Sequence, residues 1–289
     1  MLVTSLDHVV VPVSSLADAS RPYEKLGLVL TPQAAHQGIG TENRAFFAGS
    51  GADFYVELLG IRDRAEAESA GRTLYLDRMD SGIARLMLEV TAIHDVVAQL
   101  DKRGIATEVS AVMAGDGRKI CDVAPIDGVA ALGFALGLVE YGESPSERHS
   151  RRVQAGRFAH TFPLKRLDHL AAITPDLDRA TRFWTDVLEV PVFGEVRGGG
   201  MIIRQMKMGD AIFELLGPDG PGSRLHSRPA GIVNMCAFEV PNLDQAVSSA
   251  RELGFSPNDP ANGLLPGTRV ATIPANEIAG VGMQLLEYA

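Results

Sequence analysis

The chain has 289 residues, of which 46% are hydrophobic and 22% are charged, the proportions of an ordinary globular protein. Its formal net charge of −9 argues against nucleic acids and anionic membranes as partners, because both bind basic surfaces. Two cysteines, Cys121 and Cys236, are too few for a disulfide scaffold, residues 1–8 do not form a signal peptide, and no apolar run reaches the ~20 residues of a membrane span. We therefore expect a cytoplasmic protein with reduced thiols.

The first half shows the same order of expected elements twice. The first set consists of a strand at 6–13, a helix at 16–26 with Ser15 as its N-cap, and strands at 27–31, 44–48 and 54–59. The second set consists of a strand at 84–90, a helix at 94–103, and strands at 106–112, 121–124 and 136–141. Each set is one βαβββ module.

The second half follows the same order. Its expected elements are a strand at 167–173, a helix at 177–188, strands at 190–193, 202–207 and 211–215, a strand at 233–240, a helix at 243–253, and closing strands that end at 283–288. Mixed units of locally paired strands and helices of this kind are typical of an α+β fold.

The two halves also share sequence motifs in the same order. Leu6-Asp7-His8 recurs as Leu167-Asp168-His169, the Glu57-Leu58-Leu59-Gly60 strand as Glu214-Leu215-Leu216-Gly217, and the closing Glu140-Tyr141 as Glu287-Tyr288. This self-similarity indicates a tandem duplication. We place the domains at 1–145 and 163–289, and we interpret the polar, cationic segment 146–162 as an exposed connector, compatible with a helical turn.

A His and two Glu recur within the apolar strands of each half. They are His8, Glu57 and Glu140 in the first half, and His169, Glu214 and Glu287 in the second. A single strand Glu usually faces solvent, and a single His is more often a hydrogen-bonded core residue. A buried carboxylate is costly unless it is paired or bound to metal, so the repetition favours a metal or acid–base site in at least one half.

These motifs resemble the vicinal-oxygen-chelate superfamily, which includes glyoxalase I, methylmalonyl-CoA epimerase, extradiol dioxygenases and bleomycin-resistance proteins. The resemblance covers nearly the whole chain apart from the connector. It implies two tandem glyoxalase-like domains, each made of two βαβββ modules that curl into a half-open barrel around a divalent metal.

The resemblance also implies metal ligands on the first and last strands of each module. These positions are His8, Glu57, Arg85 and Glu140 in the first half and His169, Glu214, Met235 and Glu287 in the second. Many relatives carry a His where this chain has Arg85 and Met235. The two-His, one-Glu triad of Fe(II) ring-cleaving dioxygenases is therefore incomplete, unless His226 folds inward.

The remaining His and two Glu suit Mn, Ni, Co, Zn, Mg or Fe, with open positions for substrate oxygens. We expect a metal-dependent enzyme of the glyoxalase, epimerase or lyase kind, acting on a small oxygen-rich substrate and compatible with a homodimer. Its catalytic carboxylates would come from Glu57, Glu140, Glu214 and Glu287. The alternatives are a metal-free protein that binds a small molecule, as resistance members do, and a ring-cleaving dioxygenase.

Residues 36–44 resemble a glyoxalase-like subfamily and add polar contacts for a substrate. His36, Asn43 and Arg44 are the candidates there, and the alternative is a glycine-rich turn with surface polar residues. Arg85, if it points inward, would hold a substrate carboxylate or phosphate. Equally, it would pair with Glu57 or Glu140 in place of a metal.

Overall fold

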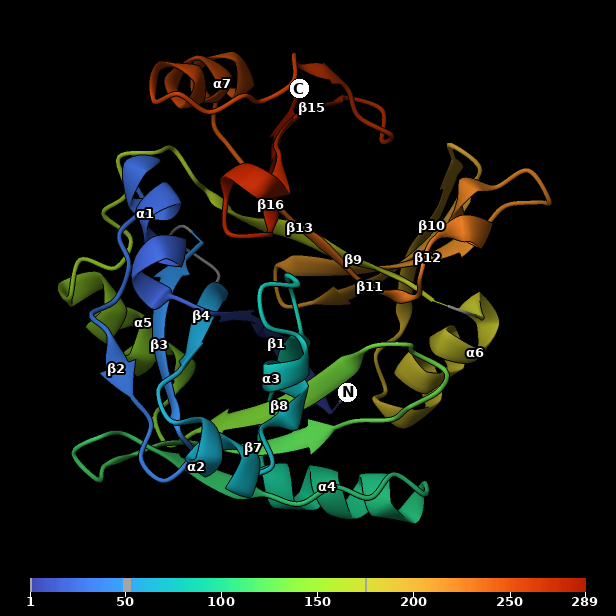
Figure 1. Cartoon of the computed structure of the whole chain (residues 1–289). Coiled ribbons are helices and arrows are strands. Elements are labelled where there is room, and N and C mark those ends of the chain that lie inside the picture. The colour runs from blue at the N-terminus through green and yellow to red at the C-terminus, as the bar shows by residue number, and fades with distance from the viewer. Residues whose placement is uncertain (1, 49–52, 175) are drawn as a thin grey trace.

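The computed structural model describes residues 2–48, 53–174 and 176–289. The chain forms two curled eight-stranded sheets, one from each half, in an α+β arrangement (Figure 1). The strands of the first are β1 (Val3–Val13), β2 (Ala34–Ala35), β3 (Thr41–Phe47), β4 (Tyr55–Ile61), β5 (Arg85–Val90), β6 (Ser110–Met113), β7 (Lys119–Ile126) and β8 (Ala135–Tyr141). They lie in the order β2-β3-β4-β1-β5-β8-β7-β6.

The second sheet has the same topology, with the order β10-β11-β12-β9-β13-β16-β15-β14. Its strands are β9 (Arg166–Ile173), β10 (Val192–Gly198), β11 (Met201–Met208), β12 (Ala211–Pro218), β13 (Gly231–Glu239), β14 (Ala261–Asn262), β15 (Thr268–Ile273) and β16 (Gly282–Tyr288). In each sheet the two modules join through an antiparallel pair, β1 with β5 and β9 with β13. The predicted pair of tandem domains, each of two βαβββ modules, is confirmed, and each half-barrel is built from its own half of the chain.

One helix follows the first strand of each module and packs against its sheet. These helices are α1 (Leu16–Lys25), α4 (Ile93–Lys102), α6 (Leu177–Arg182), which continues as the π-helical turn η1 (Phe183–Val187), and α7 (Leu243–Glu252). Ser15 caps α1 by accepting a hydrogen bond from the backbone N–H of Asp18, as expected. None of the helices among the described residues is long and apolar enough to cross a membrane.

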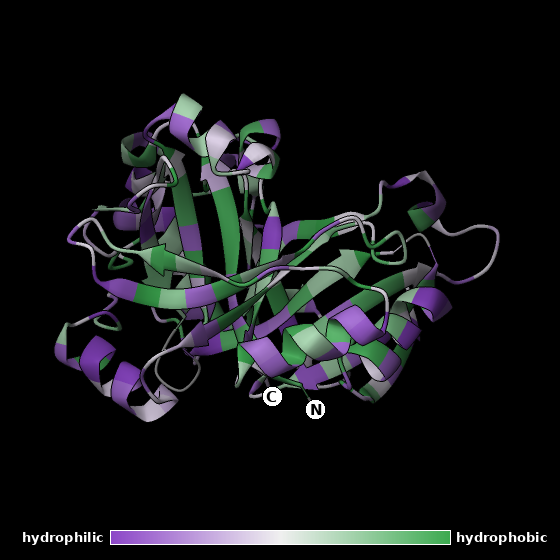
Figure 2. Ribbon diagram, turned by 90° about the horizontal axis from the view of Figure 1, so that it is seen from below, coloured by the Kyte–Doolittle hydropathy of each residue, from purple (hydrophilic) through white to green (hydrophobic). Residues whose placement is uncertain are grey.

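Strand alternation separates an apolar outer face from an inner face that lines a cavity. On β1, Val9 and Val11 belong to the large core, whereas His8 and Val10 line the cavity. In Figure 2 the strands are mostly green, whereas purple residues mark the helices and loops around them.

The two halves share this core. Phe46 lies against Phe238 with ring centroids 6.1 Å apart, and Phe134 lies against Phe213 at 5.7 Å. Asn234 of β13 accepts a hydrogen bond from the N–H of Ile83 and donates one to a carbonyl of the first half, the carbonyl of Ser81. The halves therefore bury one continuous apolar interior.

Several local predictions were wrong. Residues 27–31 do not form a strand, and the edge strand β2 begins only at Ala34. Two short helices, α2 (Arg64–Ser69) and α3 (Thr73–Asp77), were not predicted, nor were the turns η2 (Arg224–Ser227) and η3 (Ala275–Glu277). The connector contains a full helix, α5 (Pro145–Gln154), which begins with a Ser144–Glu147 capping box.

We expect Phe238→Ala to destabilise the protein by about 3–5 kcal/mol, because it opens a cavity where the two halves meet. Urea unfolding checks this, followed both by the fluorescence of Trp184, which is fully buried in the second half, and by far-ultraviolet circular dichroism. Val153→Ala is the control, since Val153 is 51% exposed, and should change stability by less than about 0.5 kcal/mol. Two separate unfolding transitions in the wild type would contradict the shared core.

Candidate functional site

A hydrogen-bonded Asp–His pair lies at the centre of the first cavity. The β1–β5 register shifts between Leu6 and His8, and Asp7 at this bulge is 2% exposed. Its Oδ2 atom lies 2.5 Å from His8 Nδ1 and accepts a hydrogen bond from the Tyr141 hydroxyl at 2.8 Å. Burial acts to raise the pKa of Asp7, but His8, Arg152 and Tyr141 together hold it below its usual value.

An ionised carboxylate only accepts hydrogen bonds, so Asp7 requires His8 Nδ1 to be the donor. The other ring nitrogen, Nε2, then faces the cavity. The His8 ring is held flat against Tyr55, with centroids 4.3 Å apart and an interplanar angle of 17°. The orientation and tautomer of His8 are therefore fixed before any ligand arrives.

Glu57 of β4 lies next to His8 Nε2. Its Oε2 atom is 3.6 Å from His8 Nε2, and its Oε1 atom accepts a hydrogen bond from the Asn43 side chain at 2.5 Å. Only 10% of the Glu57 side chain is exposed. The structure therefore brings His8, Glu57 and Asn43 together, as the sequence predicted.

The second half repeats this arrangement. Asp168 Oδ1 lies 2.8 Å from His169 Nδ1, and Asp168 Oδ2 accepts from the Tyr288 hydroxyl at 2.7 Å. His169 Nε2 is 4.0 Å from Glu214 Oε2, and Gln205 donates to Glu214 Oε1 at 2.9 Å. Burial acts to lower the pKa of His169, but Asp168 and Glu214 outweigh it and raise that pKa.

The last strand of each half presents a different residue from the one predicted. Val139 and Tyr141 face the first cavity, whereas the carboxylate of Glu140 lies on the opposite face and accepts the backbone N–H groups of Ala92 and Ile93 at the start of α4. In the second half Leu286 lines the cavity, and Glu287 pairs with Arg269 at 3.3 Å. Neither Glu140 nor Glu287 joins the His–Glu pair, so the roles predicted for both are corrected.

The predicted substrate contacts divide in the same way. His36 and Arg85 line the first cavity with Asn43. Arg44 does not, because its guanidinium donates to the carbonyl of Thr31 and pairs with Glu24 outside the cavity. In the second half Met235 lines the cavity. His226, which lies in η2, bonds to the carbonyl of Gly220 and does not line the cavity.

The two cavities differ in their linings. The first, about 160 Å³ in volume, adds Arg72, Tyr75, Arg85 and His36 to its Asp–His–Glu set. The second, about 210 Å³, is lined mainly by aliphatic side chains, with Thr268 and Gln284 as further polar groups. Burial raises the pKa of Cys121, which also lines the first cavity, to about 12, so this thiol is not a nucleophile at neutral pH.

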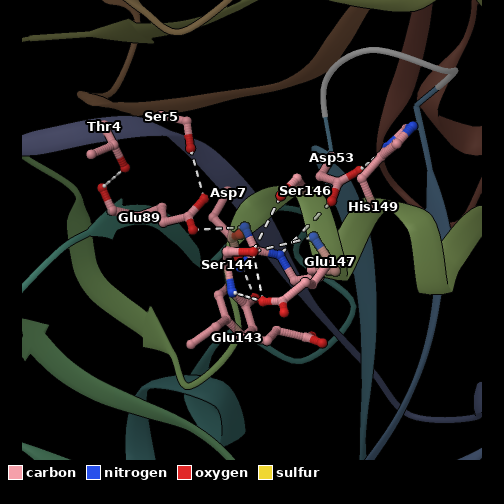
Figure 3. A network of polar contacts seen from close by, with 12 residues as sticks. Thr4, Ser5, Asp7, Asp53, Glu89, Glu143, Ser144, Ser146, Glu147 and His149 are labelled. Carbon is pink, nitrogen blue, oxygen red and sulfur yellow. Dashed lines mark hydrogen bonds and ion pairs between the residues drawn. The ribbon is translucent and has the colours of Figure 1, made fainter.

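Helix α5 extends the polar network of the first site beyond the barrel. Arg148, 1% exposed, donates to Glu89 at 2.6 Å, and its guanidinium lies 4.1 Å from the ring centroid of Tyr141, the residue that holds Asp7. Arg152 pairs with Asp53 at 2.9 Å. Figure 3 shows Glu89, Asp7 and Asp53 gathered around this helix. Most of α5 is exposed, but Arg148 and Arg152 are buried against the first half.

Comparison with known families agrees with this architecture. A family model described as "Glyoxalase-like domain" matches residues 6–154, and one described as "Glyoxalase/Bleomycin resistance protein/Dioxygenase superfamily" matches residues 166–272. The chain belongs to the glyoxalase-like family. It is a tandem member of the vicinal-oxygen-chelate superfamily, with one such domain in each half.

Several solved structures are similar to this glyoxalase-like protein, and one that spans the whole chain shares its fold. A hypothetical protein from Staphylococcus aureus is 12% identical with a TM-score of 0.65, covering 98% of both chains. Methylmalonyl-CoA epimerase from Mycobacterium tuberculosis is 24% identical with a TM-score of 0.40, covering 45% of this chain and 91% of the epimerase. A variant of the Streptomyces coelicolor epimerase in complex with 2-nitronate-propionyl-CoA is 23% identical with a TM-score of 0.39, covering 44% and 96%. No curated protein matches the chain.

The first cavity does not fit the divalent metal that the superfamily implies. His8 and Glu57 are two donors, and His36 lines the same cavity, but β5 contributes the cationic Arg85. On β8, Gly137, which pairs with Met87, offers no side-chain donor. A side chain at Gly137 would collide with Met87, where a Cβ atom would lie 2.5 Å from Sδ. Within residues 2–48, 53–174 and 176–289, no three His, Cys, Asp or Glu side chains are placed to share a metal.

The second cavity fits a metal better. His169, Glu214 and Gln284 come from β9, β12 and β16, and all three line it. They offer one imidazole nitrogen, one carboxylate and one amide oxygen. Asp168, bound to the far nitrogen of His169, is the outer carboxylate that commonly orients a metal-binding His.

We expect Arg148→Met to destabilise the glyoxalase-like protein by about 3–5 kcal/mol, because Glu89 and Asp53 would lose a buried cation. Arg151→Met, which removes the same charge from the exposed face of α5, should cost less than about 1 kcal/mol. Denaturant unfolding at neutral pH measures both. Equal losses would show that Arg148 contributes no more than a surface ion pair.

Proposed function

We propose that the first cavity is the site of an enzyme of the glyoxalase, epimerase or lyase kind that moves a proton on a small oxygen-rich substrate. The observation that carries this proposal is Glu57, a carboxylate in a mostly apolar cavity, which Asn43 holds in place beside His8 Nε2. A buried, oriented carboxylate is a competent general base.

In the proposed reaction Glu57 Oε2 removes a proton from a carbon next to a carbonyl group. The C–H bond breaks, its electron pair moves through the C–C bond onto the carbonyl oxygen to give an enolate, and the proton returns from Glu57 to the same carbon, which restores the carbonyl group. Arg85 supplies a fixed positive charge that stabilises the developing oxyanion. The strand register supports this role, because it pairs Val10 of β1 with both Glu57 and Arg85.

A divalent metal enters this proposal only at the second cavity, where His169, Glu214 and Gln284 would hold it. Bound there, it would supply Lewis-acid chemistry to a ligand with two neighbouring oxygens. The fixed cation Arg85 makes a metal unnecessary for charge stabilisation in the first cavity.

One observation favours a second candidate function, a metal-free protein that binds and sequesters a small molecule. Arg85 occupies the strand position where superfamily metal sites have a ligand, and its own partners, Asp127 and the carbonyl of Leu136, hold it rigidly. A dioxygenase finds no support. His36 also lines the first cavity, but its Nδ1 atom bonds to Thr41, and no three His, Cys, Asp or Glu side chains among the described residues are placed to share a metal.

Glu57→Gln should reduce proton exchange about 100-fold or more, because it removes the base while preserving the shape of the side chain. We would incubate the protein in D₂O with small carbonyl compounds, both charged and neutral, and follow loss of the C–H signal by proton NMR. Glu214→Gln is the matched control from the second half and should retain the exchange rate. Ligand binding without exchange would support the sequestering alternative instead.

Glu214→Gln should lower metal uptake, whereas Glu57→Gln should leave it unchanged. Elemental analysis after incubation with Mn, Ni, Co, Zn, Mg or Fe(II), and calorimetric titration of the chelator-washed protein, measure this. Metal loss in Glu57→Gln but not in Glu214→Gln would reverse our assignment of the two cavities.

A further inference from the structure

The first cavity holds a second arginine, Arg72, that neither the strand pattern nor the proposed proton transfer uses. Arg72 precedes α3, one of the two short helices inserted between β4 and β5, and its side chain lines the cavity. Its Nε atom is buried and has no hydrogen-bond partner among the described residues. A buried N–H of a charged group without an acceptor is costly, and an anion held where the Arg72 side chain lines the cavity would offset that cost through its charge.

Arg72 and Arg85 act on the same part of the cavity. The charges of both lower the pKa of Tyr75, although burial outweighs them and raises it overall. Burial, together with Arg72, lowers the pKa of His36, which leaves His36 neutral at pH 7 and unable to act as a further cation. The positive charge at this end of the cavity therefore belongs to the two guanidinium groups.

Arg85 is already positioned to receive a ligand. Its Nη2 atom donates to Asp127 at 2.9 Å and its Nη1 atom donates to the carbonyl of Leu136. These bonds use two of the five guanidinium N–H groups and fix the plane of the side chain. The ring centroid of Tyr75 lies 5.8 Å from the guanidinium carbon. The side chain of Asp127 is 54% exposed, so its screening of the positive charge on the cavity side is weak.

Apolar side chains line much of the rest of the cavity, among them Val10, Leu59, Met87, Val112 and Val123. In the second half Met235 replaces Arg85, and the described chain between β12 and β13 contains the turn η2 in place of α2 and α3. No arginine among the described residues lines the second cavity, so the pair of arginines is specific to the first cavity.

We infer that the substrate of the first cavity is a small carboxylate, whose carboxylate group binds Arg72 and Arg85 while its neighbouring C–H group faces Glu57. This inference deepens the proposed proton transfer and rests on it. Guanidinium groups bind carboxylates through paired, charge-assisted N–H···O bonds. A vicinal carbonyl or hydroxyl oxygen on the substrate would complete the contacts, which makes short 2-oxo and 2-hydroxy acids the class to test.

The test compares carboxylates with their neutral amides. Pyruvate, 2-oxobutyrate, lactate and 2-hydroxybutyrate, each with its amide, would be titrated into the full-length protein by calorimetry and ligand-observed NMR. We expect at least one acid to bind about tenfold or more tightly than its amide. Arg72→Met and Arg85→Met should each remove that preference. Arg78→Met, on the exposed end of α3, makes the same change in net charge and should keep it.

The outcomes separate this inference from the proposed function. Arginine-dependent binding of an acid without C–H exchange in D₂O would support the carboxylate site and overturn the proton transfer. Exchange of neutral carbonyl compounds, with acids and amides bound equally, would keep the proton transfer and overturn the carboxylate site. If Arg85→Met fails to fold, Arg72→Met alone decides, and binding that it leaves unchanged would overturn the inference.

Discussion

A bulge in the central strand pair of each sheet determines the geometry of both sites. Where β1 meets β5, the register shifts between Leu6 and His8. At this shift the buried side chain of Asp7 bonds to the side chain of His8, its neighbour in the sequence. The pair β9–β13 has the same shift, between Leu167 and His169. A regular strand would direct two consecutive side chains to opposite faces. The bulge therefore makes the Asp–His pair possible, and that pair fixes which imidazole nitrogen faces the cavity.

The duplicated chain has kept this unit and changed what surrounds it. Both halves retain an Asp, a His, a Glu, an amide that holds the Glu, and a Tyr that holds the Asp. The first cavity adds guanidinium groups, and the second adds aliphatic side chains and Gln284. Because a fixed cation and a bound metal would repel each other at one site, Arg85 supports the proposal that a metal would bind in the second cavity and not in the first.

The sequence predicted the fold because its signals were local and repeated. Motifs that recur in order identify a duplication without knowledge of any contact, and His8, Glu57, His169 and Glu214 lie in strands whose inward face is easily assigned. The last strand of each half was misjudged because Leu138 and Val139 are both buried, so hydrophobicity does not show which face is inward. Only pairing with β5 and β7 sets that face, which places Tyr141 in the cavity and Glu140 outside it.

The arginine contacts were hidden from sequence analysis for a different reason. Residues 144–152 are rich in charge, and a charged segment between two domains normally lies in solvent. The neighbouring sequence does not show that Arg148 bonds to Glu89, which is 59 residues away. Nor does it show that the side chain of Arg72 lines a cavity. Buried ion pairs between distant segments depend on the completed fold, and neither periodicity nor composition records them.

The cations that compensate the buried acids differ between the halves, and this affects where the first domain ends. In the second half Arg166, on β9 itself, pairs with Asp168 at 3.3 Å. In the first half the corresponding positive charge comes from Arg148 and Arg152 of α5, outside the barrel. A fragment that stopped at residue 145 would contain Asp7, Asp53 and Glu89 without either arginine, and buried carboxylates that lose their cations are strongly destabilising. We therefore infer that the first structural unit extends through α5 to Gln154, which is where the match to the glyoxalase-like family also ends.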